Sequence, residues 1–144
     1  MKIKVNVDTS LDDIVVKIST PSMSDEIDTI IRKLSKNSLI LTGINGEKTY
    51  LINENEIQVI YSENKKVYAS TEDMNLKLNY RLYELEDILD KSKFIRVSNS
   101  AIINIYQVDN FEATINGMVT IHLKNGMKEY ISRRYLKKVK EFIS

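Results

Sequence analysis

Three asparagine–glycine pairs constrain the fold of this 144-residue chain more than any other feature. They are Asn45-Gly46, Asn116-Gly117 and Asn125-Gly126, and they contain three of the four glycines. Asn-Gly favours the two-residue turn of a β-hairpin, because both residues tolerate a positive φ. Segments rich in β-branched and aromatic residues flank each pair, as strands require. The sequence therefore predicts a mostly β fold, α+β overall, in which antiparallel hairpins dominate.

Between these turns, apolar residues recur with the two-residue period of strands. Turn-forming residues separate the segments about every 8–12 residues, which is typical of an all-β module. Leu82, Leu85, Ile88 and Leu89 instead follow helical spacing and predict one internal helix over 80–89. The expected strands are 39–42, 49–52, 57–61, 67–70, 76–80, 108–115, 118–124 and 128–131.

The first 36 residues predict a small β-β-α unit ahead of a domain over 37–144. Alternation predicts strands at 2–7 and 14–18, and Ser24 begins an amphipathic helix that ends near Ser35. A unit of this size is too small to fold reliably alone. We expect it to pack on the following domain or to pair with another copy, as a dimerisation or regulatory element.

Charge is unevenly distributed along the chain. Residues 1–56 hold 7 Lys/Arg and 9 Asp/Glu, whereas residues 91–144 hold 10 Lys/Arg and 4 Asp/Glu, so the net charges are −2 and +6. A basic C-terminal third is the pattern expected of a protein that binds a polyanion. A solvated basic face balanced by the acidic half is the alternative interpretation.

The composition argues against several other classes of protein. There is no cysteine, which excludes disulfides and thiolate metal sites and fits a cytoplasmic protein. The N-terminus lacks the apolar core of a signal peptide, and no apolar run approaches the ~20 residues of a membrane span. We find no phosphate-binding loop, dinucleotide motif or metal-ligand spacing, so no cofactor and no small-molecule substrate are expected.

His122 is the only histidine and the only candidate for acid–base catalysis. It shares a predicted strand face with Thr120 and Lys124, opposite Val119, Ile121 and Leu123, so we expect it on the solvent side. A nucleophile would need a base within about 3 Å and an orienting acid, and no such arrangement is visible. We therefore interpret His122 as a surface residue and the chain as a non-enzyme.

The segment Phe94–Asn104, with sequence FIRVSNSAIIN, is the most informative stretch. Phe94 to Val97 favours a strand. Ser98, Asn99 and Ser100 can each cap a helix, so a short helix over 101–103 is expected to follow. A second stretch, Ser132–Lys138, has a capping serine followed by a basic helix. Polar groups held on such rigid bases are commonly binding residues.

Spacing in these two stretches resembles the LytTR DNA-binding domain of bacterial transcription regulators. That family carries F-x-R-x-H-x-S-x-x-x-N before a β-hairpin, and then an S-R-x-x-hydrophobic-K helix. The present chain differs by having Ser98 in place of the histidine, and the resemblance covers roughly Asn53 to the C-terminus. The matching positions are Phe94, Arg96, Ser100, Asn104, Asn125-Gly126 and Ser132-Arg133.

The resemblance implies sequence-specific binding of double-stranded DNA, with loops entering successive major grooves. Asn99 and Arg134 are then the best base readers, because Asn pairs bidentately with adenine and Arg with guanine. Lys66 is a third, and Ser98 reaches less far than the family's histidine and cannot become charged. Asn104 is expected to satisfy buried backbone. The full set of expected DNA-binding residues is Lys65, Lys66, Arg96, Ser98, Asn99, Ser100, Arg133, Arg134 and Lys137, in which Arg133 and Lys137 contact phosphate and Arg96 forms either an ion pair or a phosphate contact.

The family often carries a phosphorylatable receiver, which the first 36 residues are too few to form. The resemblance suggests control by homodimerisation on direct repeats, or by a membrane-protein partner. The alternative function is a protein-interaction module whose basic C-terminal helix docks on an acidic partner.

Overall fold

The computed structural model describes residues 1–34 and 39–144, and the chain divides into two units, Met1–Lys36 and Asn37–Ser144. Within the described residues, ten strands and three α-helices form, so the expected mostly β fold is confirmed. The expected domain boundary after residue 36 lies outside the described residues. Each unit is described separately.

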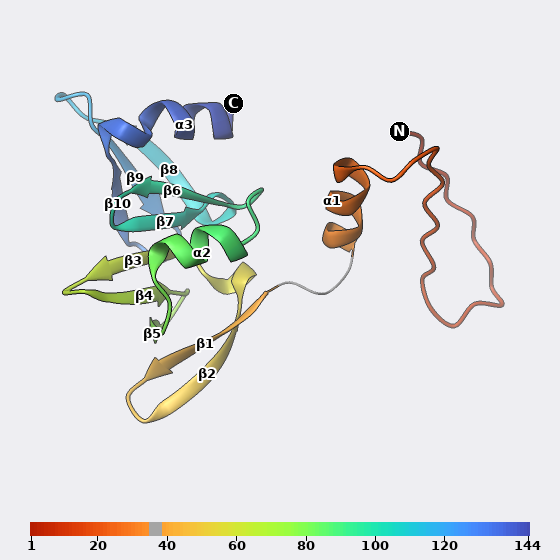
Figure 1. Ribbon diagram of the computed structural model, residues 1–144, viewed down its shortest axis with the longest axis horizontal. Coiled ribbons are helices and arrows are strands. Elements are labelled where there is room, and N and C mark those ends of the chain that lie inside the picture. The colour runs from red at the N-terminus through yellow and green to blue at the C-terminus, as the bar shows by residue number, and fades with distance from the viewer. Residues whose placement is uncertain (35–38) are drawn as a thin grey trace. The chain divides into compact units, whose positions relative to one another are not determined.

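The first unit contains one helix, α1 (Asp25–Leu34), as predicted (Figure 1). Ser24 begins it: its carbonyl oxygen accepts from the Asp28 N–H at 3.1 Å, and its hydroxyl accepts from the Ile27 N–H at 3.4 Å. Asp25, Glu26 and Asp28 lie in the first turn, where negative charge suits the positive end of the helix dipole. The expected end near Ser35 falls outside the described residues.

The two strands predicted at 2–7 and 14–18 do not form, so this prediction is wrong. A turn does lie between the two segments: the Leu11 N–H donates to the Asp8 carbonyl at 3.3 Å, and the Asp8 carboxylate accepts from the Ser10 backbone at 3.0 Å. The Ser10 hydrogen bonds lower the pKa of Asp8. A strand needs a partner, and a lone two-stranded hairpin is at best marginally stable in water. Alternation in the sequence thus identifies an apolar face, but it does not show whether a partner strand is present.

The second unit contains two antiparallel sheets. Seven strands lie in the order β2-β1-β5-β4-β3-β7-β6, and three in the order β10-β9-β8. Asn-Gly pairs form the turns before β2, β9 and β10, and all three glycines have positive φ, as predicted. The strands are β1 (Ile40–Asn45), β2 (Lys48–Asn53), β3 (Val59–Glu63), β4 (Lys66–Ser70), β5 (Asn75–Leu78), β6 (Phe94–Ser98), β7 (Ala101–Asn104), β8 (Val108–Ala113), β9 (Val119–Leu123) and β10 (Lys128–Ile131).

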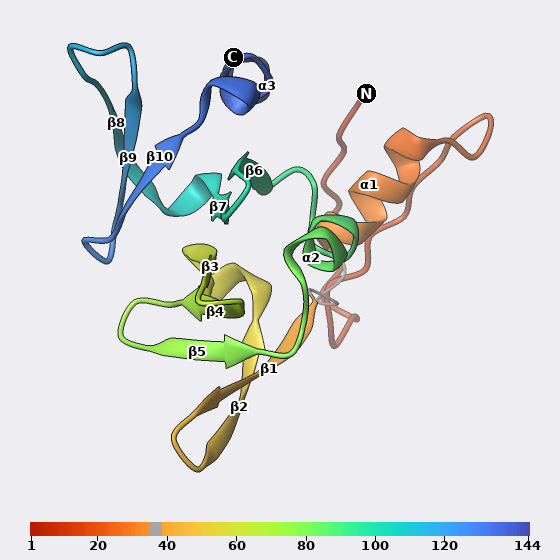
Figure 2. The ribbon, with the colours of Figure 1, turned by 60° about the vertical axis from the view of Figure 1, so that its left-hand side comes forward.

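Two apolar cores lie on opposite faces of strands β3, β6 and β7. One core packs under α2 (Leu82–Ile88) and includes Leu85, Phe94 and Ile102. The other packs under the three-stranded sheet and α3 (Arg133–Ile143). Figures 1 and 2 show α3 next to β6 and β10. Because consecutive strand residues face opposite sides, Ile102 enters the first core and Ile103 the second.

Residues 101–104 form a strand instead of the short helix that we predicted. Ser98 and Ala101 face each other across a tight turn, so β6 and β7 make a hairpin. All four residues of β7 are buried. A strand covered on both faces shows a continuous apolar run, and over four residues such a run cannot be distinguished from a buried helical turn. Capping residues Ser98 to Ser100 act here as turn residues, a role they fill equally well.

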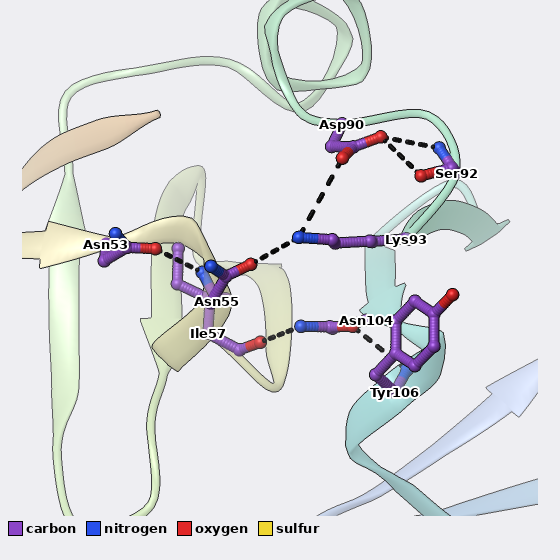
Figure 3. A network of polar contacts seen from close by, with 8 residues as sticks. All are labelled: Asn53, Asn55, Ile57, Asp90, Ser92, Lys93, Asn104 and Tyr106. Carbon is purple, nitrogen blue, oxygen red and sulfur yellow. Dashed lines mark hydrogen bonds and ion pairs between the residues drawn. The ribbon is translucent and has the colours of Figure 1, made fainter. Parts of the chain in front are cut away.

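Asn104 has the structural role that we predicted for it. Its side chain is 1% exposed, its amide nitrogen donates to the Ile57 carbonyl at 3.0 Å, and its amide oxygen accepts from the Tyr106 N–H at 3.0 Å. Figure 3 shows this pair of bonds beside a second set in which Lys93 contacts Asn55 at 2.7 Å and pairs with Asp90. Together these contacts join the connection before β3 to the segments before β6 and after β7.

Asn125 ties the two sheets together at the same end of β3. Its backbone N–H donates to the Gln58 side chain at 2.8 Å, and its amide nitrogen donates to the Ser70 hydroxyl and the Thr71 carbonyl, each at 2.8 Å. The Asn125 amide oxygen accepts from the Met127 N–H at 3.0 Å. The asparagine expected only as a turn residue therefore also fixes the position of the β9–β10 hairpin.

Replacing Gly43 of β1 by alanine is expected to destabilise the second unit by about 1–3 kcal/mol. A Cβ at this position would lie 2.7 Å from Ile52 Cδ1 and 2.8 Å from Leu76 Cβ, so the core must shift to admit it. Urea unfolding followed by circular dichroism measures the change. The neighbouring Thr42→Ala variant is the control, because Thr42 is exposed. Equal stability of the Gly43→Ala and Thr42→Ala variants would contradict the close approach.

Candidate nucleic-acid interface

Three polar segments meet at one end of the second unit, which we call the turn end. They are the β3–β4 turn (residues 63–66), the β6–β7 turn (98–100) and the start of α3 (132–134). The Ser62 N–H donates to the Ser100 carbonyl at 2.8 Å, and the Ser132 N–H donates to the Val97 carbonyl at 3.0 Å. The structure thus brings together all three segments that the sequence singled out.

Lys65 and Lys66 are exposed in the β3–β4 turn. Asn64 and Lys65 have φ values of 52° and 64°, the double left-handed geometry of a type I′ hairpin turn. Lys66 lies directly across the ladder from Glu63, so part of its charge is balanced within the hairpin. Lys65 lies at the tip of the turn, and its side chain extends into solvent.

The Arg96 side chain stabilises the β6–β7 turn by hydrogen bonds to its backbone. Its Nε donates to the Ser98 carbonyl at 2.8 Å, its Nη2 donates to the Asn99 carbonyl at 2.6 Å, and its Nη1 forms an ion pair with Glu86 of α2. The side chain is only 14% exposed. Of the two roles expected for Arg96, this geometry favours the structural ion pair. Glu86, which the sequence analysis did not single out, holds the guanidinium in place.

Asn99 is exposed at the tip of the β6–β7 turn, and hydrogen bonds hold its two neighbours in place. The Ser98 hydroxyl accepts from the Ser100 N–H at 3.1 Å and lies 3.2 Å from the Ser100 hydroxyl. The Asn99 amide oxygen accepts from the Tyr135 hydroxyl of α3 at 3.1 Å. Both serines therefore stabilise the turn, and Tyr135 orients the Asn99 amide, a role that sequence spacing alone could not reveal.

The first turn of α3 carries exposed cations. Arg133 and Arg134 in this turn and Lys137 in the next turn are exposed, and no acidic residue lies in the first turn. Ser132 has the extended backbone of an N-cap, but its side chain makes no capping hydrogen bond. The Arg134 guanidinium lies 5.8 Å from the centroid of the Tyr135 ring, within the range of a cation–π contact. Tyr135 thus contacts both Asn99 and Arg134.

Arginines at a helix N-terminus oppose the helix dipole, which favours anions there. Among residues 1–34 and 39–144, no ion pair joins Arg133, Arg134 or Lys137 to a carboxylate. A phosphate at this position would meet both the free backbone N–H groups and the two guanidinium groups. This part of the turn end is therefore electrostatically suited to bind a phosphate group.

Glu129 of β10 lies close to the turn end and was not expected there. It shares a sheet face with Ile121, directly opposite on β9, and burial raises its pKa. Tyr61 of β3 is also affected: burial is the main cause that raises its pKa, and the charges of Glu63 and Glu129 contribute. Tyr61 stacks on Tyr68 with the ring centroids 5.5 Å apart. No sequence signal distinguishes Glu129 from a solvated strand residue.

Glu129→Gln is expected to stabilise the protein at pH 7 and to leave its stability nearly unchanged near pH 4.5. The pKa of Glu129 in the folded state is raised above 4.5, so the unfolded chain loses this proton first. Stability of the wild type therefore falls as the pH rises from about 4.5 through the folded pKa. Urea unfolding of both proteins at pH 4.5, 5.5 and 7 measures the difference. The raised pKa of Glu129 would be contradicted if the difference in unfolding free energy between the two proteins did not widen with pH. It would also be contradicted if Glu72→Gln, a change at an exposed residue, gave the same difference.

His122 and its neighbours only partly follow the expectation. His122 is partly exposed, and its Nε2 lies 3.1 Å from the Glu112 carboxylate. Ile121 and Leu123 are buried as expected, but Thr120 is only 5% exposed, so its predicted place on the solvent side is wrong. Thr120 is covered because it lies in the central strand, between Glu112 of β8 and Tyr130 of β10.

Other types of site find little support in the described part of the chain. In residues 1–34 and 39–144 there is no group of three or more His, Asp or Glu side chains that could hold a metal ion. None of the helices described is long and apolar enough to cross a membrane.

Comparison with known proteins identifies the family of the second unit. The model of the LytTr DNA-binding domain matches residues 47–144. In the structural comparison, a LytTr DNA-binding domain from a Bacillus cereus protein, described as a methyl-accepting/DNA response regulator, superposes with a TM-score of 0.70. That match has 20% sequence identity and covers 73% of this chain and 96% of the other, so it supports the fold.

Curated relatives match the whole chain, including the first unit. An uncharacterized HTH-type transcriptional regulator of Staphylococcus aureus strain NCTC 8325 / PS 47 is 34% identical over 100% of this chain and 99% of its own length. The corresponding protein of strain MRSA252 is 33% identical over the same shares.

The relatives' name refers to a helix-turn-helix, which places two helices one short turn apart. Among the described residues, strands separate α1 from α2 and α2 from α3. The family model instead covers residues 47–144, which include Phe94–Asn104, the hairpin around Asn125 and the basic start of α3. The fold of the superposed domain agrees with this match. The chain therefore belongs to the LytTR family of DNA-binding transcription regulators.

Proposed function

We propose that this protein is a sequence-specific transcription regulator that reads double-stranded DNA through the loops of its turn end. The observation that carries the proposal is the convergence of three segments distant in sequence. The Ser62–Ser100 and Tyr135–Asn99 hydrogen bonds hold them together, and each presents exposed polar or cationic side chains. The β6–β7 turn and the start of α3 would enter one major groove, and the β3–β4 turn would reach the adjacent groove.

The roles of individual residues follow from their exposure and partners. Asn99 keeps its amide nitrogen and one oxygen lone pair available for an adenine edge, and Arg134 is exposed beside it for guanine. Lys66 is the third base reader. Lys65, Arg133 and Lys137 neutralise phosphates, which gives affinity without sequence information. Arg96, Ser98 and Ser100 act through the turn, because their polar groups hold its backbone and each other.

Selection from a random double-stranded DNA library at two salt concentrations tests this function. We expect enrichment of a repeated short motif, with an affinity that falls steeply as salt rises, because phosphate contacts release counterions. Retention without a motif would reduce the function to a basic surface. No retention at either salt would favour the alternative function, in which α3 docks on an acidic protein.

Regulation and location are part of the same proposal. A protein that reads DNA in a bacterium acts in the cytoplasm, and the enriched motif would show whether two copies bind direct repeats, as the family pattern suggests. A membrane protein that sequesters the regulator is a further expectation. Co-purification from bacterial membranes with and without the motif DNA would test it, since sequestration predicts that the DNA releases the protein.

A further inference from the structure

The first unit exposes an apolar surface that its own residues do not cover. Ile3, Val5, Val7, Ile14 and Val16 are 58–87% exposed, and the first three alternate with polar residues as on one face of a sheet. Units below about 40 residues usually need disulfides, a metal or oligomerisation to become stable. The chain has no cysteine, and its described residues contain no metal-binding cluster. Association remains as the route to stability.

Pairing the two extended segments within one chain is unfavourable. An antiparallel hairpin would need to place Ile3, Val5 and Val7 opposite Ile18, Val16 and Ile14. The same register places Lys4 directly opposite Lys17. Like charges that face each other across a ladder destabilise the pair. The structure agrees, because residues 1–24 contain no ladder and the backbone hydrogen bond recorded among them is that of the Leu11–Asp8 turn.

We propose that residues 2–8 pair antiparallel with the same residues of a second copy, centred on Val5. In this register Val5 faces Val5 of the second copy, and Ile3 faces its Val7, so the apolar residues share one face. On the opposite face, Lys2 lies across from Asp8 of the second copy, and the two-fold axis repeats this pair. The segment therefore matches itself in its apolar face and in the Lys2–Asp8 pairs, while Lys4 lies opposite the neutral Asn6.

The area available suits a stable dimer. Twelve large apolar side chains of the first unit are at least 38% exposed, and they include Ile31 and Leu34 of α1. A fully buried aliphatic side chain removes roughly 60–120 Å² from water, so these side chains, weighted by their exposed fractions, supply about 500–1,000 Å² per copy. Stable interfaces bury about 800 Å² per partner. The remaining apolar residues of 14–18 and α1 would cover the central pair of strands.

Cross-linking tests the register directly, because the native chain has no cysteine. Val5→Cys places two thiols on the two-fold axis, where opposed Cα atoms lie about 4.5–5.5 Å apart, within the range of a disulfide. Val7→Cys is the matched control, since its two copies would lie about 14 Å apart along the strands. Under mild oxidation we expect Val5→Cys to form a covalent dimer at least 10-fold faster than Val7→Cys. Equal rates would overturn the register.

Sedimentation equilibrium tests the association itself. The wild type is expected to sediment at twice 16.7 kDa at micromolar concentration. Val5→Asp should weaken the dimer at least 100-fold, because two carboxylates would meet on the axis, whereas Asn6→Asp adds the same charge on the opposite face and should change little. A monomeric wild type would overturn the proposal and point to another partner, and so would a Val5→Asp dimer of unchanged affinity. No DNA is present, so the result is independent of the DNA-binding function.

Discussion

Arg134→Glu is expected to lower the affinity for the selected DNA motif at least about 100-fold while the fold stays intact. The change would remove the proposed bidentate base contact, worth about 1–3 kcal/mol, and add repulsion of the neighbouring phosphates. Arg134 is exposed and no hydrogen bond or ion pair holds it among the described residues, so unfolding cannot explain the loss. Fluorescence anisotropy with motif and scrambled DNA measures the effect, and circular dichroism checks the fold.

Two further variants separate base reading from simple charge. Lys124→Glu makes the same charge reversal next to Asn125, at the opposite end of β3, and should reduce affinity only slightly. Arg133→Ala should weaken binding to motif and scrambled DNA alike, whereas Arg134→Ala should weaken mainly the motif. If Arg134→Ala and Arg133→Ala lowered both affinities equally, Arg134 would contact phosphate and the assignment as a base reader would be wrong.

Asn104→Leu is expected to destabilise the second unit by about 2–4 kcal/mol. Leucine cannot replace the hydrogen bonds of Asn104 to the Ile57 carbonyl and the Tyr106 N–H. Asn104 is only 1% exposed, so water cannot replace them either. Urea unfolding gives the change in free energy. Asn55→Ala, an exposed member of the neighbouring contacts in Figure 3, should cost less than about 1 kcal/mol. Similar losses in both variants would contradict a buried role for Asn104.

The expected hairpins could be read from the sequence because their signals are local. Asn45-Gly46 and Asn125-Gly126 dictate positive φ at the glycine, and this preference survives in the folded protein. The helix after Ser132 is equally local, since its apolar residues recur at helical spacing. The candidate site could be proposed from the sequence for the same reason, because its residues lie in turns and at a helix start.

Pairing across long sequence distances could not be read in this way. The sequence predicts a helical turn over 101–103 because it does not show that both faces of β7 are covered. Thr120 looks solvent-exposed until its two neighbouring strands are known. The hydrogen bond between Tyr135 and Asn99 spans 36 residues, and the one between Asn125 and Ser70 spans 55. Such contacts depend on tertiary structure, which propensities do not encode.

Burial of β3 and β7 on both faces has a consequence for how this family can diversify. The hairpin that presents Asn99 is anchored by two separate cores, so its amides should exchange with solvent among the slowest in the chain. Exposed residues at its tip and at the start of α3 contribute little to stability, and mutation can change them freely. With the base-reading roles proposed above, a few substitutions at Asn99, Arg134 and Lys66 would give new operator preferences while the same scaffold is inherited unchanged.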